Sequence, residues 1–318
     1  MGTVDTGGGQ GAHAHRHGGV SVADLTGPAD GEPDVAVVLA ARQGTFALGT
    51  GERVDGYTLN GTSPGPALQV SQGDLVQVTL TNVDVPDGVT LHWHGVDVPN
   101  AEDGVAGVTQ DAVRPGEQHV YRFLAEDAGT YWYHSHQVSH AQVRGGLFGT
   151  LVVLPPGERE DHDVVAAVHS YDGRRTVNGR AGVGSVAADA GSTVRVRLVN
   201  TDKSPLRAWV SGSPFRVVAV DGTDVNDPAE LRDEGIVVTA GGRVDVVVTA
   251  PARIDAGGGA ALVVGPGDAD VPARPDPERQ VDLLSYGRPA ALPFDPTDVD
   301  RRFTYDIGRR IGLLDGRP

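Results

Sequence analysis

The sequence contains no cysteine. A disulfide framework, a zinc site with thiolate ligands and a copper site with a thiolate ligand are therefore excluded within this chain. No apolar run approaches the roughly 18 residues that a transmembrane helix needs. The N-terminal stretch MGTVDTGGGQGAHAHRHGG also lacks the apolar core of a secretory signal. We therefore expect no membrane span and no signal peptide in this chain, which is either cytosolic or separated from an export or anchoring segment.

Positive charge is scarce as well, because 26 Lys and Arg stand against 42 Asp and Glu, for a net charge of −16. Such a chain repels phosphate backbones and anionic membranes on average, so we expect no nucleic-acid partner. Glycine, in contrast, is abundant at 45 residues, about twice its usual share. Valine-rich runs recur between Gly, Pro, Asp and Asn clusters, which indicates many short strands joined by turns. The composition predicts an all-β protein with room for roughly two domains in its 318 residues.

Composition and periodicity divide the chain into four parts. The first is polar, glycine-rich and without periodicity, so we expect a disordered tail that acts as a linker, with loose metal binding by His13, His15 and His17 as the alternative. Two strand-rich units follow, with period-2 alternation as in LVQVTLTN. A Pro- and Asp-rich connector comes last. The expected parts are residues 1–34, 35–156, 157–268 and 269–318.

The second strand-rich unit repeats the first. Residues 73–82 and 191–200 share the frame Gly-x-x-Val-x-Val-x-Leu-x-Asn, and PGEQHVYRF at 115–123 is echoed by AGGRVDVVV at 240–248. His92 stands ten residues beyond Asn82, whereas Val210 stands ten residues beyond Asn200. We therefore expect the second unit to keep the scaffold without metal ligands, as a spacer or docking domain.

Two His-x-His pairs carry the chemistry, His92 and His94 in TLHWHG and His134 and His136 in TYWYHSH. Side chains at i and i+2 of a strand point to one side, about 6.6 to 6.8 Å apart. With metal–imidazole bonds of about 2.0 Å, such a pair suits two ions about 3.5 to 4 Å apart better than one ion. Imidazole binds copper, zinc, iron and nickel, so spacing does not choose the metal. The alternative is four packed structural histidines, at the cost of burying imidazoles without partners.

The segments HWHG, GTYWYHSH and GLFGTLVV together resemble the first cupredoxin domain of the multicopper oxidases, the family of laccases, ascorbate oxidase and bacterial cuprous oxidases. SPGPALQVSQGDLVQVTLTN resembles the opening strands of that domain, and SPFRVVAVDGTDV resembles the second domain of three-domain members. The resemblance implies an all-β fold of two tandem cupredoxin-like Greek-key β-sandwich domains. It also implies a location outside the cell or in the cell envelope.

The resemblance further implies a copper cofactor. In the family, a trinuclear copper cluster reduces dioxygen to water and is held by His-x-His pairs of the first and last domains. Carried over by motif, His92 would bind the type 2 copper, His94 and His134 one type 3 copper, and His136 the other. The other ligands come from a His-x-His and a His-Cys-His of the final domain, whose Cys also binds the type 1 copper that oxidises a small reducing substrate. We therefore expect half of a trinuclear site, no turnover by this chain alone, and a third cupredoxin domain outside it.

Asp103 lies nine residues past His94, in NAEDGVAG. In the family an acid at this place relays protons, so the resemblance implies a catalytic role, while a turn Asp before Gly104 is the alternative. We expect His140 at the surface or just outside the ligands. Three further histidines have no motif support and are expected to be structural: His119, His162 and His169.

Two functions of other classes stay open. A non-catalytic copper-binding cupredoxin-like protein needs only the His pairs, and a metal-free β-sandwich interaction protein needs none of them. A copper nitrite reductase and a two-domain laccase fit less well, because each requires a cysteine in one of the two domains present here.

Overall fold

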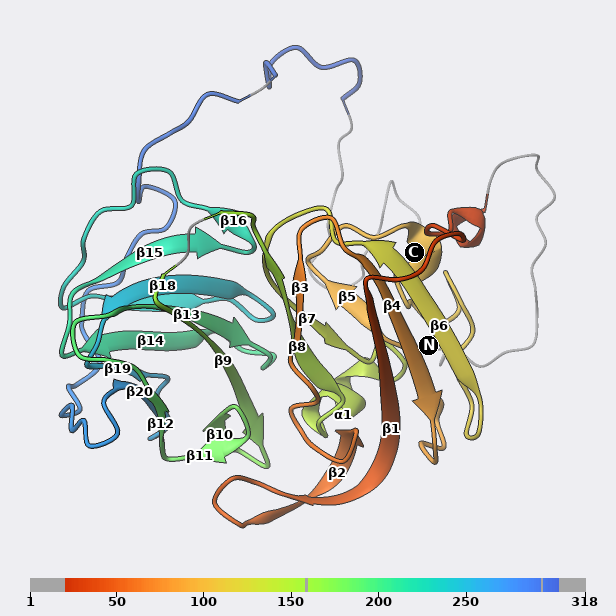
Figure 1. Ribbon diagram of the computed structural model, residues 1–318, viewed down its shortest axis with the longest axis horizontal. Helices are drawn as coiled ribbons and strands as arrows, with labels where there is room; N and C mark the ends of the chain where they lie inside the picture. The colour runs from red at the N-terminus through yellow and green to blue at the C-terminus, as the bar shows by residue number, and fades with distance from the viewer. Residues whose placement is uncertain (1–20, 158–159, 293, 303–318) are drawn as a thin grey trace, which may run out of the picture. The chain divides into compact units, whose positions relative to one another are not determined.

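A computed structural model describes residues 21–157, 160–292 and 294–302 (Figure 1). The chain separates into two compact units, residues 1–287 and 288–318. The first unit holds every strand found among the described residues and forms two β-sandwiches, which confirms the all-β expectation. The described residues of the second unit contain turns but no helix or strand. The boundaries expected at 156 and 268 both fall inside the first unit and stay predictions.

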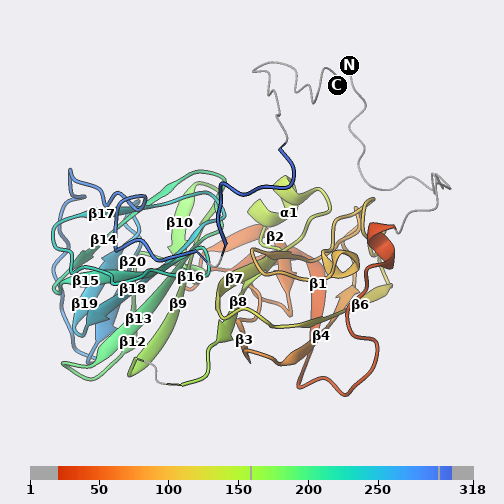
Figure 2. The same ribbon diagram turned by 90° about the horizontal axis from the view of Figure 1, so that it is seen from above.

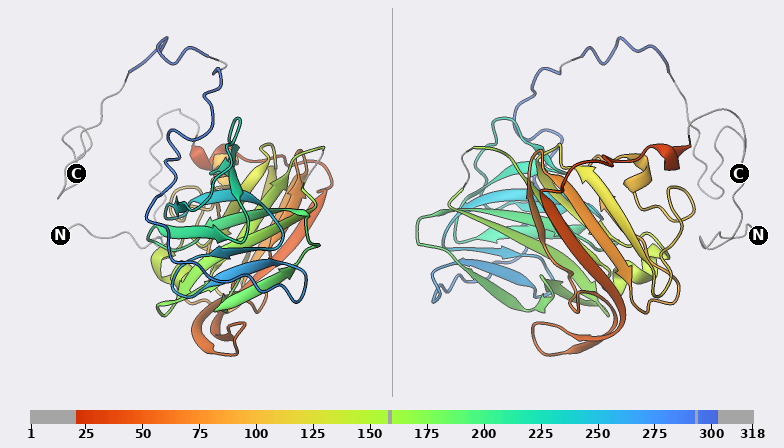
Figure 3. Two further views of the ribbon diagram at one scale, coloured as in Figure 1. Left: turned by 90° about the vertical axis from the view of Figure 1, so that its left-hand side faces the viewer. Right: turned by 45° about the vertical axis from the view of Figure 1, so that its right-hand side comes forward.

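The first sandwich packs two four-stranded sheets, ordered β2-β1-β4-β6 and β3-β8-β7-β5. Figure 3 shows the β1, β4 and β6 sheet from outside in its right-hand view. Three short helices belong to this part: η1 (Val22–Asp24), η2 (Asn100–Glu102) and α1 (Ser139–Arg144). The strands are β1 (Val35–Ala47), β2 (Arg53–Leu59), β3 (Leu68–Ser71), β4 (Leu75–Asn82), β5 (His92–His94), β6 (Gln118–Leu124), β7 (Gly129–His134) and β8 (Phe148–Leu154).

The second sandwich packs a sheet ordered β11-β10-β9-β13-β18-β15-β16 against one ordered β12-β20-β19-β14-β17. Alternating valines fill the space between them, as their period of 2 requires. The strands are β9 (His162–Tyr171), β10 (Arg174–Val177), β11 (Arg180–Ala181), β12 (Val183–Ala187), β13 (Thr193–Asn200), β14 (Leu206–Ser211), β15 (Phe215–Val220), β16 (Thr223–Asp224), β17 (Gly235–Val238), β18 (Arg243–Thr249), β19 (Ala252–Asp255) and β20 (Ala261–Gly265).

Strand pairing reproduces the internal repeat. β4 lies between parallel β1 and antiparallel β6, and β13 lies between parallel β9 and antiparallel β18. Each central strand ends in a fully buried asparagine whose side-chain amide donates to backbone carbonyls of the loops around it. Asn82 donates to Val85 and Val113, and Asn200 donates to the carbonyls of Ser204, Val238 and Thr239. The repeat seen in the sequence therefore holds in the strand order.

The two sandwiches meet along β7 and β8 of the first and β9, β13 and β18 of the second (Figure 2). An apolar cluster with members from both sandwiches fills part of this contact. It is separate from the cores inside the two sandwiches. Its buried members are Phe46, Leu48, Val54, Trp132, Phe148, Tyr171 and Val199.

A buried polar network continues the contact. The Thr130 hydroxyl, on β7, donates to Asp245 at 2.8 Å, and Arg197 donates to the same carboxylate at 2.9 Å. Arg195 bonds Asp245 as well, and Arg197 also pairs with Asp163. Because a buried charge is tolerated only when it is paired, this network fixes how β18 lies against β7.

The described part of the expected N-terminal tail differs from expectation. Residues 21–34 lie against the first sandwich instead of belonging to a disordered tail, because Glu102 accepts from the Gly27 N–H and Arg122 donates to the Pro28 carbonyl. Residues 1–20, with their three histidines, lie outside the described residues. The connector expected from 269 begins as extended chain bonded to the second sandwich, where the Trp209 indole donates to the Arg274 carbonyl.

Candidate metal centre

Antiparallel pairing of β5 with β7 sets His92 opposite His134 and His94 opposite Trp132. The ring centroid of His92 lies 5.8 Å from that of His94, 5.3 Å from that of His134 and 5.4 Å from that of His136. The structure thus brings all four histidines of the two predicted pairs to one place. They come from two neighbouring strands and the residues that follow β7.

Ring nitrogens within this cluster lie close enough to share an ion. His92, His94 and His134 each offer one nitrogen, and all three nitrogens lie within 4.8 Å of one another. The closest two, Nδ1 of His94 and Nε2 of His134, are 3.3 Å apart. Since metal–imidazole bonds are about 2.0 Å long, both nitrogens can reach one ion. An all-imidazole donor set fits copper, although it does not exclude other transition metals.

Neighbouring oxygens orient two of the rings. The Nδ1 of His134 donates to the Ser135 carbonyl at 2.9 Å, which leaves Nε2 with its lone pair facing the cluster. The Nδ1 of His92 lies 3.0 Å from the Asp103 carbonyl oxygen and 3.1 Å from its carboxylate Oδ1. Hydrogen bonds of this kind fix both tautomer and ring direction in metal-ligating histidines. Asp103 therefore lies beside the cluster and holds one of its rings.

Burial favours the neutral form of three of these rings, which is the form that binds metal. It lowers the pKa of His134 to about 3 and, with help from the positive charge of Arg243, lowers the pKa of His94 to about 4. Burial also lowers the pKa of His136. At neutral pH a metal ion therefore does not compete with protons at these three rings.

The other histidines among the described residues lie outside the cluster. His140, on α1, is exposed and lines the cavity that His94 and His134 also face. His119 packs on Tyr121 in β6, and His169 lies between Thr201 and the Arg144 carbonyl. The structural roles expected for His119, His162 and His169 stay predictions.

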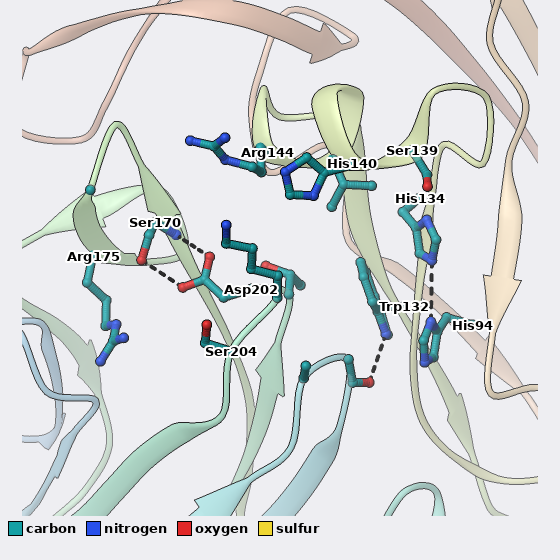
Figure 4. A pocket seen from close by; sticks show the side chains of 16 residues that line it. His94, Trp132, His134, Ser139, His140, Arg144, Ser170, Arg175, Asp202 and Ser204 are labelled. Atoms are coloured by element: carbon teal, nitrogen blue, oxygen red, sulfur yellow. Dashed lines mark hydrogen bonds between the residues drawn. The ribbon is translucent and has the colours of Figure 1, made fainter. Parts of the chain in front are cut away.

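A cavity of about 510 Å³ opens beside the cluster (Figure 4). Its walls come from both sandwiches: His94, Trp132 and His134 from the first, and Asp202 and Gly241 from the second. Figure 4 shows Trp132 and His94 side by side, with His134 beyond His94 along the dashed hydrogen bond. The second sandwich therefore forms part of the wall around two of the candidate ligands.

Sequence reasoning missed the second-sandwich residues that lie near the candidate ligands. Gly241 and Arg243 lie in the segment AGGRVDVVV, which aligns with PGEQHVYRF of the first unit. In that alignment Arg243 replaces Gln118 and Asp245 replaces Val120. Charged residues at alternate positions of a valine-rich strand were the available signal, because charges facing a core need partners.

Comparisons with known proteins agree with this geometry. Two models of the same family, multicopper oxidase, match residues 40–158 and 130–257. Laccase-1 of Botryotinia fuckeliana is 31% identical over 225 residues, covering 61% of this chain and 39% of that protein. L-ascorbate oxidase of Cucumis sativus is 44% identical over 106 residues, covering 32% of this chain and 18% of that protein. The crystal structure of a multi-copper oxidase from Pseudomonas thermotolerans superposes with a TM-score of 0.67 at 28% identity, covering 78% of this chain and 68% of that one.

The fold and the cluster define a protein built from cupredoxin-like sandwiches, one of which carries a group of imidazoles that could hold a metal ion. The chain belongs to the multicopper oxidase family, as the resemblance indicated. Copper is the cofactor that this membership implies, and members of the family use dioxygen and a reducing substrate. The chain spans 19%, 39% and 18% of the lengths of three curated relatives that it matches.

Proposed function

We propose that this chain is the portion of a laccase-like multicopper oxidase that supplies half of its trinuclear copper site. The intact protein couples one-electron oxidation of a small reducing substrate to the reduction of dioxygen to water. The observation that carries the proposal is the convergence of His92, His94, His134 and His136 from two paired segments. A structural role alone gives no reason for three ring nitrogens within 4.8 Å of one another.

In this proposal the type 3 copper shared by His94 and His134 is the best supported, because their nitrogens are 3.3 Å apart. His92 would hold the type 2 copper, and His136 the other type 3 copper. Four imidazoles are too few for three ions. The remaining ligands, and the type 1 copper that accepts electrons from substrate, would come from a third cupredoxin domain outside this chain.

The residues of this chain would have three tasks. The four imidazole rings would hold the ions, and the Ser135 and Asp103 oxygens would keep His134 and His92 turned towards them. Copper supplies the redox chemistry that carries electrons to dioxygen. Asp103, with its carboxylate 3.1 Å from His92 and partly exposed, can take protons from solvent and deliver them beside the cluster. This is the catalytic role that we propose for it.

For location we propose the cell exterior or the cell envelope, on the ground of family membership. No helix among the described residues is long and apolar enough to cross a membrane.

A copper titration tests the proposal. Residues His13, His15 and His17 are first replaced by alanine, so that the N-terminal segment does not bind copper. In that background the chain should bind copper tightly in competition with a chelator, and His94→Ala with His134→Ala should abolish this binding. Replacing His119 and His162, which lie on the same chain outside the cluster, serves as the matched control and should change nothing.

Two results would decide against the proposal. Binding that survives the loss of His94 and His134, or that falls equally in the control, would show that these rings are not the ligands. Tight copper binding, with no dioxygen reduction once a third domain is supplied, would instead favour a non-catalytic copper-binding protein.

A further inference from the structure

We propose that the second sandwich helps to build the metal centre. Its turn at residues 239–242 and Arg243 hold the imidazole of His94 in position. In this assignment Gly241, Arg243 and Trp132 are positioning residues that keep Nδ1 of His94 turned towards His134. The inference rests on the proposed copper site and revises the expectation that the second sandwich is a spacer.

Gly241 touches the far edge of the His94 ring. Its φ is +71°, and a Cβ on it would lie 2.9 Å from Cε1 and 3.1 Å from Nε2 of His94. Only a residue without a side chain fits there, because real Cβ atoms essentially never approach another atom that closely. The backbone of the turn thus closes off the Nε2 side of the ring, while Nδ1 faces Nε2 of His134 at 3.3 Å.

Trp132 connects the rings of His94 and His134 to the same turn. Its indole packs on His94 with centroids 4.7 Å apart and on His134 with centroids 4.3 Å apart. The indole N–H donates to the Gly241 carbonyl at 3.1 Å (Figure 4). One hydrogen bond between the sandwiches therefore sets the plane against which two candidate ligands stack.

Arg243 holds the turn in place. It is only 5% exposed, and its Nε donates to the Thr130 carbonyl on β7 at 3.0 Å. Its other nitrogens donate to the carbonyl of Asp221 at 3.0 Å and of Gly241 at 3.4 Å. A Cβ on Gly95, which follows His94, would lie 2.2 Å from Arg243 Nη2, so the guanidinium also lies against β5.

The equivalent turn of the first sandwich has none of these contacts. Gly116 has the same kind of backbone, with φ +84°, but a Cβ on it would meet nothing within 4 Å. Gln118, the counterpart of Arg243, is exposed. The shared scaffold therefore requires a glycine turn, and only the second sandwich uses that turn to contact a candidate ligand.

This equivalence supplies a matched pair of variants, Gly241→Ala and Gly116→Ala. Both force alanine into a left-handed conformation at similar conformational cost, but only Gly241→Ala pushes on His94. We expect Gly241→Ala to weaken copper binding about 10-fold or more, the size of effect seen when groups behind metal ligands are changed. Gly116→Ala should leave copper affinity unchanged.

A second pair covers the case in which Gly241→Ala does not fold. Trp132→Phe keeps an aromatic face but removes the N–H that reaches Gly241, whereas Trp209→Phe removes an equivalent indole bond to the Arg274 carbonyl. We expect only Trp132→Phe to weaken copper binding. Long-range ¹H–¹⁵N spectra of the metal-free chain should then show altered His94 ring nitrogens in Trp132→Phe and unaltered ones in Trp209→Phe.

The outcomes separate this inference from the proposed function. Equal copper affinities and unaltered His94 spectra in Gly241→Ala or Trp132→Phe would overturn the positioning role while leaving the copper site intact. If the wild-type cluster binds no copper, the proposed function fails, and the ring spectra of the metal-free chain still support or overturn the contact between the turn and His94.

Discussion

The two sandwiches have the same central strand order but place different side chains at equivalent positions. Where the first pairs His92 with His134 across β5 and β7, the second pairs Val210 with Ile254 across β14 and β19, and both apolar side chains are buried. The fold therefore has no need of imidazoles at this place. Their presence in one copy, next to an open cavity, makes that copy the candidate for metal binding.

The faces of the central sheets differ in a second way. Val120 of β6 is 42% exposed, whereas its counterpart on β18, Asp245, is 1% exposed and lies against β7 of the first sandwich. Burial raises the pKa of Asp245, while Arg197 and Arg195 act in the opposite direction. The first sandwich thus exposes this face to solvent, whereas the second sandwich packs it against the first.

The largest effect on stability should come from removing the Asp245 hydrogen bonds at the contact between the sandwiches. Asp245→Ala leaves two buried guanidinium groups short of a partner, so we expect the free energy of unfolding to fall by about 3–5 kcal/mol. Val120→Ala, at the equivalent exposed position, should cost less than about 1 kcal/mol. Urea denaturation followed by tryptophan fluorescence measures both. A similar loss of free energy of unfolding in both variants would show that the buried position in the second sandwich contributes no more to stability than the exposed one in the first.

An intermediate loss of stability, equal in the two sandwiches, is expected at the buried asparagine that both copies share. Asn82→Ala and Asn200→Ala each leave buried loop carbonyls without a donor, which should cost about 1–3 kcal/mol in either sandwich. The same urea experiment measures it. A difference of more than about 1 kcal/mol between the two variants would mean that the loops around these asparagines are not held in the same way.

The smallest effect concerns Arg42 and His169, which hold equivalent positions beside an aspartate in the two sandwiches. Arg42 lies 4.0 Å from Asp84 at the surface of the first sandwich, and in the second His169 lies 3.7 Å from Asp202 with only 1% of its side chain exposed. Burial lowers the pKa of His169, so the folded state keeps it neutral while the unfolded state takes up a proton near its ordinary pKa of 6.5. Its contribution to stability is present above pH 6.5 and is lost as pH falls towards the folded-state pKa.

We therefore expect His169→Gln to reduce the loss of stability below that pH, by at most about 1.4 kcal/mol per pH unit. Arg42→Gln should lower stability by less than about 1 kcal/mol at every pH. Thermal unfolding at a series of pH values measures both slopes. An unchanged slope in His169→Gln would show that this ring does not resist protonation in the folded chain.

Much of the fold could be predicted because its signals are local. Period-2 alternation in LVQVTLTN marked a strand, the shared Gly and Asn frame marked the repeat, and the two His-x-His pairs marked the cluster. The part of the N-terminal segment that the structure describes, residues 21–34, was misjudged from composition alone. Its order depends on Glu102 and Arg122, which bond its backbone from elsewhere in the sequence.

The sequence by itself determined that this is a repeated β-sandwich protein with His-x-His pairs in one copy, since strand periodicity and motif spacing act over a few neighbouring residues. Only the tertiary structure decided that His94 turns Nδ1 inward and rests on Gly241, a residue from the other sandwich. Contacts between residues so far apart depend on how two finished sandwiches pack, and no local pattern encodes that packing.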